Sequence, residues 1–330
     1  MTKAVGPFYP SGQQIQLSRG NSRVVVTQVG ATLRSYEVDS HQIIWAFDED
    51  EICSAGRGQV LAPWPGRIQD GQYSFAGVQG VAGLDDSDRC CAIHGLVRWA
   101  PWTIQEVTEE TARLEYWLAP QPAYPFSLHL AVSYTLNDEG LLVQYEAVNL
   151  GEKPIPFGIG FHPYFAVRNG SVDTSRIQIP ADTHLVLDKR GLPTGAESVA
   201  ETSYDFRRTS DGEGHPLSTL RSIGKAHLSE CFTDLCFDED DRWRVVFQPV
   251  EDSEASVVVW GDRSFRYILV FTGDPLAEGI RRRAVAIEPM TCPPNALRTG
   301  QDLIILEPHV KSTGNWGIHP LEALKSHQTL

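Results

Sequence analysis

The sequence contains few cysteines, six in 330 residues, and no two of them form a CxxC pair. A disulfide scaffold needs a denser set, and zinc ribbons and thioredoxin-like centres need the CxxC spacing, so we expect reduced thiols. Long apolar runs are absent too, and no stretch reaches the roughly 18 residues of a membrane span. The segment MTKAVGPFYPSGQQ at the start lacks the apolar core of a signal peptide. These absences predict a cytoplasmic protein with no membrane partner.

Basic residues are also scarce relative to acidic ones. The chain has 28 lysines and arginines against 42 aspartates and glutamates, which gives a net charge of −14. Such a chain repels nucleic acids and anionic surfaces, so we expect no nucleic-acid partner. The sequence has neither a GxGxxG nor a GxxxxGK[ST] pattern, which removes the usual nucleotide-binding signatures.

Helical periodicity is the third feature that is missing. The chain has 28 glycines and 21 prolines, and few windows carry an amphipathic helical stripe. Short β-branched or alternating segments occur instead, and Asn137–Gly140 predicts a four-residue hairpin connection between two of them. The strand candidates are Arg23–Val29, Leu128–Leu136, Leu141–Asn149, Trp243–Gln248, Ser256–Trp260, Tyr267–Thr272, Ala284–Glu288 and Leu303–Glu307. Since no strand–helix alternation, fixed-period repeat or long linker interrupts the chain, we expect one all-β domain over residues 1–330.

Arg67 follows a stiff segment, Val60–Tyr73, in which two prolines flank Trp64. An arginine fixed beside a tryptophan offers forked N–H donors next to a flat apolar face, a suitable wall for a sugar. A surface arginine stacked on Trp64 explains the same pattern, and the residues alone do not separate these two interpretations.

Two histidines and one glutamate stand in unusual settings. His94 precedes a glycine in AIHGLVRWAPW, His162 precedes a proline in the aromatic segment FGIGFHPYF, and Glu288 ends the apolar run AVAI. A carboxylate at the end of a buried strand is costly unless it has partners or a task. The three residues could form a metal triad, but the HExxH-type spacing of zinc enzymes is absent, so we expect no metal.

Four segments, in order, resemble the aldose 1-epimerase (galactose mutarotase) family. They are PWPGRIQDGQY, AIHGL, GFHPYF and AIEPMTCPPNALRTG, which all lie between residues 58 and 300. The resemblance implies a large single-domain antiparallel β-sandwich with its site on a concave face. It also implies a monomer or homodimer that acts on a free aldohexose such as glucose or galactose and needs no cofactor.

The resemblance assigns roles to individual residues. It implies Glu288 as general base, His162 as general acid, and His94 and Arg67 as groups that bind the sugar. The family commonly has an Asp that binds sugar hydroxyls where this chain has Ser229, and we expect Glu230 to take that role.

The implied reaction needs an acid and a base at the two ends of the C1–O5 unit. A base removes the proton of the anomeric O1 while an acid protonates the ring oxygen O5, so that the ring opens and recloses on the other face. Alternatives are a hexose-6-phosphate 1-epimerase, for which Arg57, Arg89 or Arg98 would have to line the pocket rim, and a non-catalytic sugar-binding module. A glycoside hydrolase is disfavoured because it needs two carboxylates and only Glu288 lies in a persuasive setting.

Overall fold

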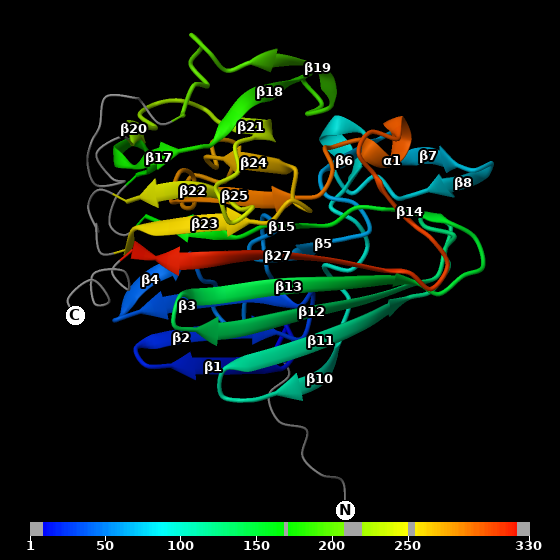
Figure 1. Ribbon diagram of the computed structural model, residues 1–330, viewed down its shortest axis with the longest axis horizontal. Helices are drawn as coiled ribbons and strands as arrows, with labels where there is room; N and C mark the ends of the chain where they lie inside the picture. The colour runs from blue at the N-terminus through cyan, green and yellow to red at the C-terminus, as the bar shows by residue number, and fades with distance from the viewer. Residues whose placement is uncertain (1–8, 168–170, 208–219, 250–254, 322–330) are drawn as a thin grey trace, which may run out of the picture.

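Two large antiparallel β-sheets form the body of the molecule in the computed structural model (Figure 1). The structure describes residues 9–167, 171–207, 220–249 and 255–321, and the statements below refer to these ranges. The larger sheet has the strand order β1 (Gln14–Arg19), β2 (Ser22–Thr27), β3 (Thr32–Val38), β4 (His41–Ile44), β16 (Tyr164–Ala166), β25 (Ala284–Met290), β24 (Tyr267–Phe271), β21 (Ser229–Leu235), β18 (Ala181–Leu187) and β19 (Pro193–Ser198). Beside this order, β15 (Gly160–Phe161) pairs with β25, and β5 (Val60–Leu61) pairs with β15.

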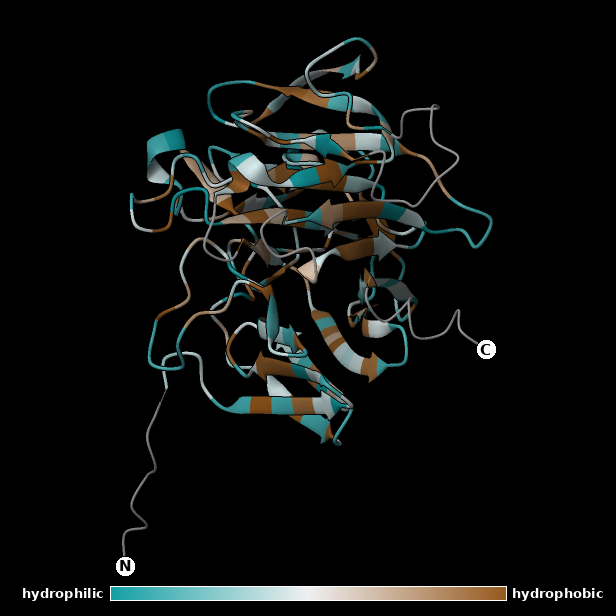
Figure 2. Cartoon of the chain, turned by 90° about the vertical axis from the view of Figure 1, so that its left-hand side faces the viewer, coloured by the Kyte–Doolittle hydropathy of each residue, from teal (hydrophilic) through white to brown (hydrophobic). Residues whose placement is uncertain are grey.

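The second sheet covers one face of the first. Its order is β10 (Thr103–Val107), β11 (Thr111–Leu118), β12 (Leu128–Asn137), β13 (Gly140–Asn149), β27 (Lys311–Pro320), β23 (Val257–Gly261), β22 (Trp243–Gln248), β17 (Arg176–Gln178) and β20 (Arg221–Ser222). Buried side chains from both sheets belong to one continuous hydrophobic cluster. Brown and teal bands alternate along strands in Figure 2, as expected where one face of a sheet packs on a core.

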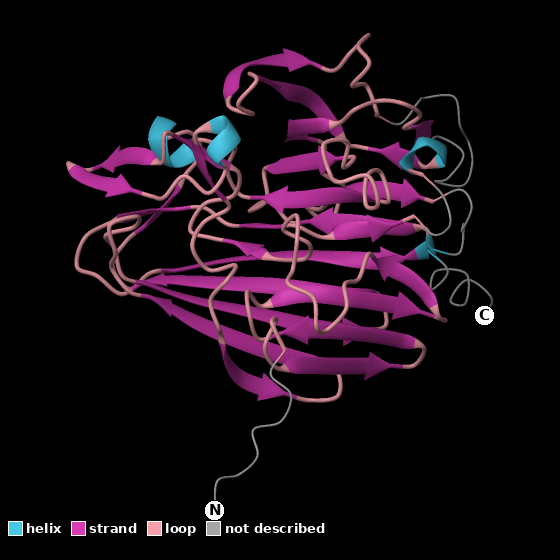
Figure 3. Ribbon diagram, turned by 180° about the vertical axis from the view of Figure 1, so that it is seen from behind, coloured by secondary structure: helices cyan, strands magenta, loops and turns pink. Residues whose placement is uncertain are grey.

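Small two-stranded ribbons gather at one end of the sandwich (Figure 1). They are β6 (Arg67–Gln69) with β9 (Cys91–Ile93), and β7 (Gln72–Phe75) with β8 (Val78–Val81); a further pair is β14 (Ile155–Phe157) with β26 (Ile304–Leu306). Helical structure in the described ranges amounts to single turns (Figure 3): α1 (Ala296–Thr299), η1 (Ser87–Arg89) and η2 (Val172–Thr174).

The predicted all-β antiparallel sandwich is confirmed, and each strand candidate overlaps an observed strand. The hairpin between β12 and β13 is tighter than predicted. Asn137 and Gly140 pair with each other, so only Asp138 and Glu139 connect the strands. Gly140 has a φ of 119°, a left-handed value that favours glycine and permits the short turn.

Two further expectations concern thiols and membranes. All six cysteines are unpaired in the structure, as expected for reduced thiols. Within the described ranges, no helix has the length and apolar character needed to cross a bilayer.

Candidate active site

The side chains of strand β25 point alternately toward the core and toward the candidate site. Val285 and Ile287 are buried in the cluster between the sheets, whereas Ala286 packs on the opposite face beside Tyr164. Because side chains alternate along a strand, Glu288 also lies on that opposite face. Glu288 is 1% exposed, and it lines a cavity of about 540 Å³. The sequence thus places one carboxylate on an otherwise apolar strand.

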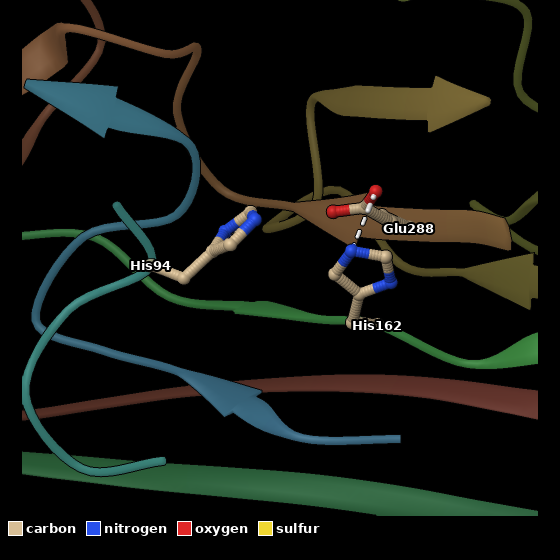
Figure 4. Close-up of side chains that lie close together, drawn as sticks. All are labelled: His94, His162 and Glu288. Atoms are coloured by element: carbon tan, nitrogen blue, oxygen red, sulfur yellow. Dashed lines mark ion pairs between the residues drawn. The ribbon is translucent and has the colours of Figure 1, made fainter. Parts of the chain in front are cut away.

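His162 reaches the same cavity from the irregular link between β15 and β16. Gly160 pairs with Met290 and Tyr164 pairs with Ala286, both in β25, so the link His162–Pro163 lies beside Glu288. The backbone carbonyl of His162 accepts a hydrogen bond from the N–H of Gly58 over 2.8 Å. Its imidazole Nε2 is 3.3 Å from Oε1 of Glu288 (Figure 4).

Tyr164 holds the imidazole of His162 from one side. The two rings are stacked, with centroids 4.9 Å apart and planes inclined by 8°. The hydroxyl of Tyr164 donates to the backbone carbonyl of Ala55 over 3.1 Å. Gly56 lies on another side, where an added Cβ would be only 2.9 Å from Cδ2 of His162. These contacts restrict the ring to one orientation.

His94 lies just beyond β9 and points toward His162 and Glu288 (Figure 4). Its φ is 62°, in the left-handed region, and Gly95 follows with a φ of 74°. A Cβ at Gly95 would lie 2.0 Å from the carbonyl oxygen of Ala62, so only glycine permits this close approach. The backbone N–H of Gly66 donates to Nδ1 of His94 over 3.2 Å, which fixes the ring.

Arg67 begins β6 and lines the cavity with its guanidinium held by a carboxylate. Its Nε donates to Oδ2 of Asp86 over 2.7 Å, and both side chains are largely buried. Trp64 is not part of this wall, because it is 2% exposed and borders a different cavity. The structure therefore supports neither a shared Arg67–Trp64 wall nor a surface stack of the two.

Burial sets the protonation of the central pair. Burial raises the pKa of Glu288 well above its ordinary value, and the nearby charge of Arg67 offsets this only in part. Burial lowers the pKa of His162 to about 3. The pKa of His94 is also lowered well below its ordinary value, by burial first and then by the charges of His162, Arg98 and Arg67. Both shifts favour the uncharged forms, a protonated carboxyl on Glu288 beside a neutral imidazole on His162, and in that state one transferable proton lies between the two groups.

The structure places Glu230 away from this cavity. In β21, Ser229 lines the cavity, and its neighbour Glu230 points to the opposite face because side chains alternate. Oε2 of Glu230 lies 3.5 Å from Nδ1 of the buried His184, and Tyr204 hydrogen-bonds to the same carboxylate. Burial raises the pKa of Glu230. The expected hydroxyl-binding role of Glu230 does not fit this position.

Of the three arginines considered for a phosphate-binding rim, two line the cavity. Arg89 and Arg98 are there, while Arg57 is buried against the ring of Trp45 at 4.6 Å. Nη2 of Arg98 is 2.5 Å from Oδ2 of Asp85. Nη1 of Arg89 is 3.6 Å from Asp86. Both guanidinium groups thus already have carboxylate partners.

Sequence reasoning missed the residues that hold the site together. Asp85 and Asp86, which pair with the arginines, lie in the acidic run LDDSDR directly before β9. Tyr164 stands two positions after His162 in the aromatic segment FGIGFHPYF, and side chains two positions apart in a strand-like segment share a face, which is the signal that could have found it. Asp274, which also lines the cavity, pairs with Arg282 over 2.7 Å.

His94, His162 and Glu288 are close enough to suggest a metal site, with one ligand atom of each within 4.8 Å of the others. The hydrogen bond from Gly66 argues against it. Because Nδ1 of His94 accepts a hydrogen bond, the proton of the neutral ring lies on Nε2. A metal-ligating histidine has the reverse arrangement, in which the nitrogen remote from the metal donates. The donor set therefore fits a metal ion poorly.

Comparisons with known proteins identify the family to which this fold belongs. The family model "Aldose 1-epimerase" matches residues 13–318, and the chain belongs to that family. The uncharacterized protein YihR of Escherichia coli K12 is 31% identical over 298 residues, covering 90% of both chains. Maltose epimerase of Levilactobacillus brevis is 25% identical over 82% of this chain and 84% of its own. The solved structure of a GalM/aldose epimerase homologue from C. elegans superposes with a TM-score of 0.78 at 18% identity, covering 93% of this chain and 98% of that one.

Proposed function

We propose that the protein is an aldose 1-epimerase that interconverts the α and β anomers of a free aldohexose. The observation that carries this proposal is the pair formed by Glu288 and His162, two buried side chains that line the cavity with Nε2 and Oε1 3.3 Å apart. O1 and O5 of a pyranose are both bonded to C1, so two groups this close reach both oxygens at once. Among relatives, the maltose epimerase is named for an epimerase activity, which supports an enzyme over a sugar-binding module.

The reaction follows from the single proton that the pair holds. Transfer of this proton from Glu288 to His162 yields a carboxylate and an imidazolium without exchange with solvent. The carboxylate accepts the proton of O1 while the imidazolium protonates O5, and the C1–O5 bond breaks to give the aldehyde. Rotation about C1–C2 presents the other face of the carbonyl, and the reverse transfers close the ring.

Two further residues orient the sugar. His94 presents an Nε2–H donor, because its Nδ1 is occupied by Gly66. Arg67 presents the N–H groups that Asp86 does not use. Fixing the ring in this way lowers the entropic cost of bringing O1 and O5 to the catalytic pair.

A phosphorylated sugar is the second candidate, because Arg89 and Arg98 line the cavity. Their pairing with Asp86 and Asp85 favours the unphosphorylated sugar, since a phosphate would have to compete with these carboxylates.

Polarimetry tests the proposal directly. Freshly dissolved α-D-glucose, α-D-galactose and α-D-glucose 6-phosphate are each followed with and without the protein. We expect faster relaxation of optical rotation for a free hexose. A protein that binds sugar but leaves every relaxation rate unchanged is a binding module, and acceleration of the phosphate alone supports the second candidate.

A further inference from the structure

Hydrogen-bond donors gather along one side of the candidate active site. Side chains from β6, η1 and the segment that follows β9 supply them, and all of these line the cavity: Arg67, Arg89, His94 and Arg98. Guanidinium groups only donate hydrogen bonds, and the neutral ring of His94 donates through Nε2. A sugar hydroxyl accepts and also donates, so its own proton needs an acceptor elsewhere in the cavity.

Carboxylates are strong acceptors, and within the described ranges four of them line the cavity: Asp85, Asp86, Asp274 and Glu288. Asp85 and Asp86 pair with Arg98 and Arg67, which line the same cavity. Glu288 takes the anomeric hydroxyl in the proposed reaction. Asp274 remains for another hydroxyl, because the two groups that hydrogen-bond to it lie outside the lining of the cavity.

Asp274 is held from behind the cavity wall. Its Oδ1 accepts a hydrogen bond from Nη1 of Arg282 over 2.7 Å, and its Oδ2 accepts one from the hydroxyl of the fully buried Thr272. At the rim, Nε2 of the exposed His227 is 3.5 Å from Oδ1. A carboxylate has about four lone-pair positions, so Asp274 keeps acceptor capacity in a fixed orientation.

The larger sheet places Asp274 away from the catalytic pair. Leu269 of β24 pairs with Glu288 of β25, and both residues line the cavity. Phe271, two residues further along β24, lines it as well and lies about 7 Å along the strand from Leu269. Asp274 follows just beyond the end of this strand. The floor of the cavity therefore runs from Glu288 past Phe271 toward Asp274.

We propose that Asp274 accepts a hydrogen bond from the 4-hydroxyl of the aldose and so determines which 4-epimer the protein prefers. The inference rests on the proposed function, because Glu288 and His162 fix the C1 end of the ring. C4 lies across the ring from C1, and Asp274 lies at the far end of the cavity floor. Glucose and galactose differ only in the direction of the hydroxyl at C4, so an acceptor held in one place distinguishes them.

The first test uses the wild-type protein, so no variant has to fold. Binding is measured by calorimetry and epimerisation by polarimetry for glucose, galactose and 4-deoxy-D-xylo-hexose, which lacks the hydroxyl that differs between them. We expect the 4-deoxy sugar to bind at least about tenfold more weakly than the preferred hexose, since a hydrogen bond to a charged group is lost. The 6-deoxy analogue of the preferred hexose should lose much less.

Asp173 provides a matched control for Asp274. Nε of Arg282 donates to Oδ1 of Asp173 over 2.7 Å, the same length as its bond to Asp274, but Asp173 does not line the cavity. We expect Asp274→Ala to weaken binding of the preferred hexose at least about tenfold and to leave the 4-deoxy sugar unchanged. Asp173→Ala should leave both unchanged. Asp274→Asn, which keeps the size of the side chain, gives the same comparison if Asp274→Ala does not fold.

Three results would overturn the inference. The wild type could bind the 4-deoxy sugar as tightly as the preferred hexose, the two alanine variants could weaken every sugar equally, or Asp274→Ala could weaken the 4-deoxy sugar as much as the hexose. If no sugar is epimerised but binding still depends on both Asp274 and the 4-hydroxyl, the contact stands and the proposed function fails.

Discussion

The backbone N–H of Gly66 donates a hydrogen bond to Nδ1 of His94 over 3.2 Å. This contact decides the tautomer of a neutral ring, because the nitrogen that accepts cannot also carry the proton. His94 therefore acts as a donor through Nε2. His162 differs, since its Nε2 faces the carboxyl of Glu288 and its Nδ1 has no hydrogen-bond partner among the described residues.

The two histidines should therefore respond differently to glutamine. In the proposed reaction His162 transfers a proton, so for His162→Gln we expect kcat to fall by about 10²- to 10⁴-fold with a small change in KM. His94→Gln keeps an N–H donor in a less favourable position, so KM should rise and kcat should fall only modestly. Steady-state kinetics on the preferred aldose checks both. A large fall in kcat for His94→Gln alone would show that the two histidines have the opposite roles.

The charge of Asp86 should matter for sugar binding through Arg67. Asp86→Asn keeps the size of the side chain but loses the charge that holds the guanidinium. Hydrogen bonds to charged groups contribute about 1.5–3 kcal/mol, so we expect KM to rise by about tenfold or more. Asp138→Asn is the control, because the pair of Asp138 with Arg19 lies at the surface. Equal effects of both substitutions on KM would show that Asp86 has no specific role in sugar binding.

Metal removal should leave turnover unchanged. The tautomer of His94 prevents it from joining His162 and Glu288 as a ligand without losing the hydrogen bond from Gly66. The measurement is kcat/KM after exhaustive dialysis against a chelator. A large loss that one divalent ion restores would contradict this description of the site.

The low pKa of His162 predicts that stability falls in mild acid. The folded pKa is about 3, below the unfolded value of 6.5, so the folded state binds fewer protons between these values. The contribution of His162 to the free energy of unfolding is fully present above pH 6.5, and it is lost as the pH falls toward 3. The raised pKa of Glu288 acts in the opposite direction in both proteins, so the comparison between them isolates His162. We expect the urea midpoint to decrease more between pH 7 and pH 5 in the wild type than in His162→Gln. Parallel curves for the two proteins would show that His162 does not titrate in this way.

The sequence predicted the β-strands because they carry their own signals, whereas the sandwich followed from the family resemblance. The alternation LHLAVSYTL reappears as β12, and the apolar run ending at Glu288 reappears as β25. The approach of Arg67, His94, His162 and Glu288 to one cavity followed from the family resemblance. Spacing alone could not predict it, because these residues are separated by up to 221 positions and meet only through sheet pairing.

Two details of the site could not be predicted from the sequence, for physical reasons. Whether Ser229 or Glu230 faces the cavity depends on the register of β21, and a shift of one residue reverses the face. The pairing of Arg67 with Asp86 depends on the antiparallel ribbon of β6 and β9, which brings the preceding acidic turn beside Arg67. A short ribbon of this kind has too few residues to show a pattern.

The central claim is that Glu288 exchanges the proton of the anomeric hydroxyl, and Glu288→Gln tests it most directly. The amide keeps the shape of the side chain but cannot take the proton, and loss of a buried ionisable group should leave thermal stability equal or higher. The measurement is the relaxation of optical rotation of freshly dissolved α-aldose, with calorimetry to confirm that the variant still binds the sugar. The account predicts retained binding and a rate at least about 10²-fold below wild type. A folded variant that binds the sugar and relaxes it at near wild-type rate would contradict the account.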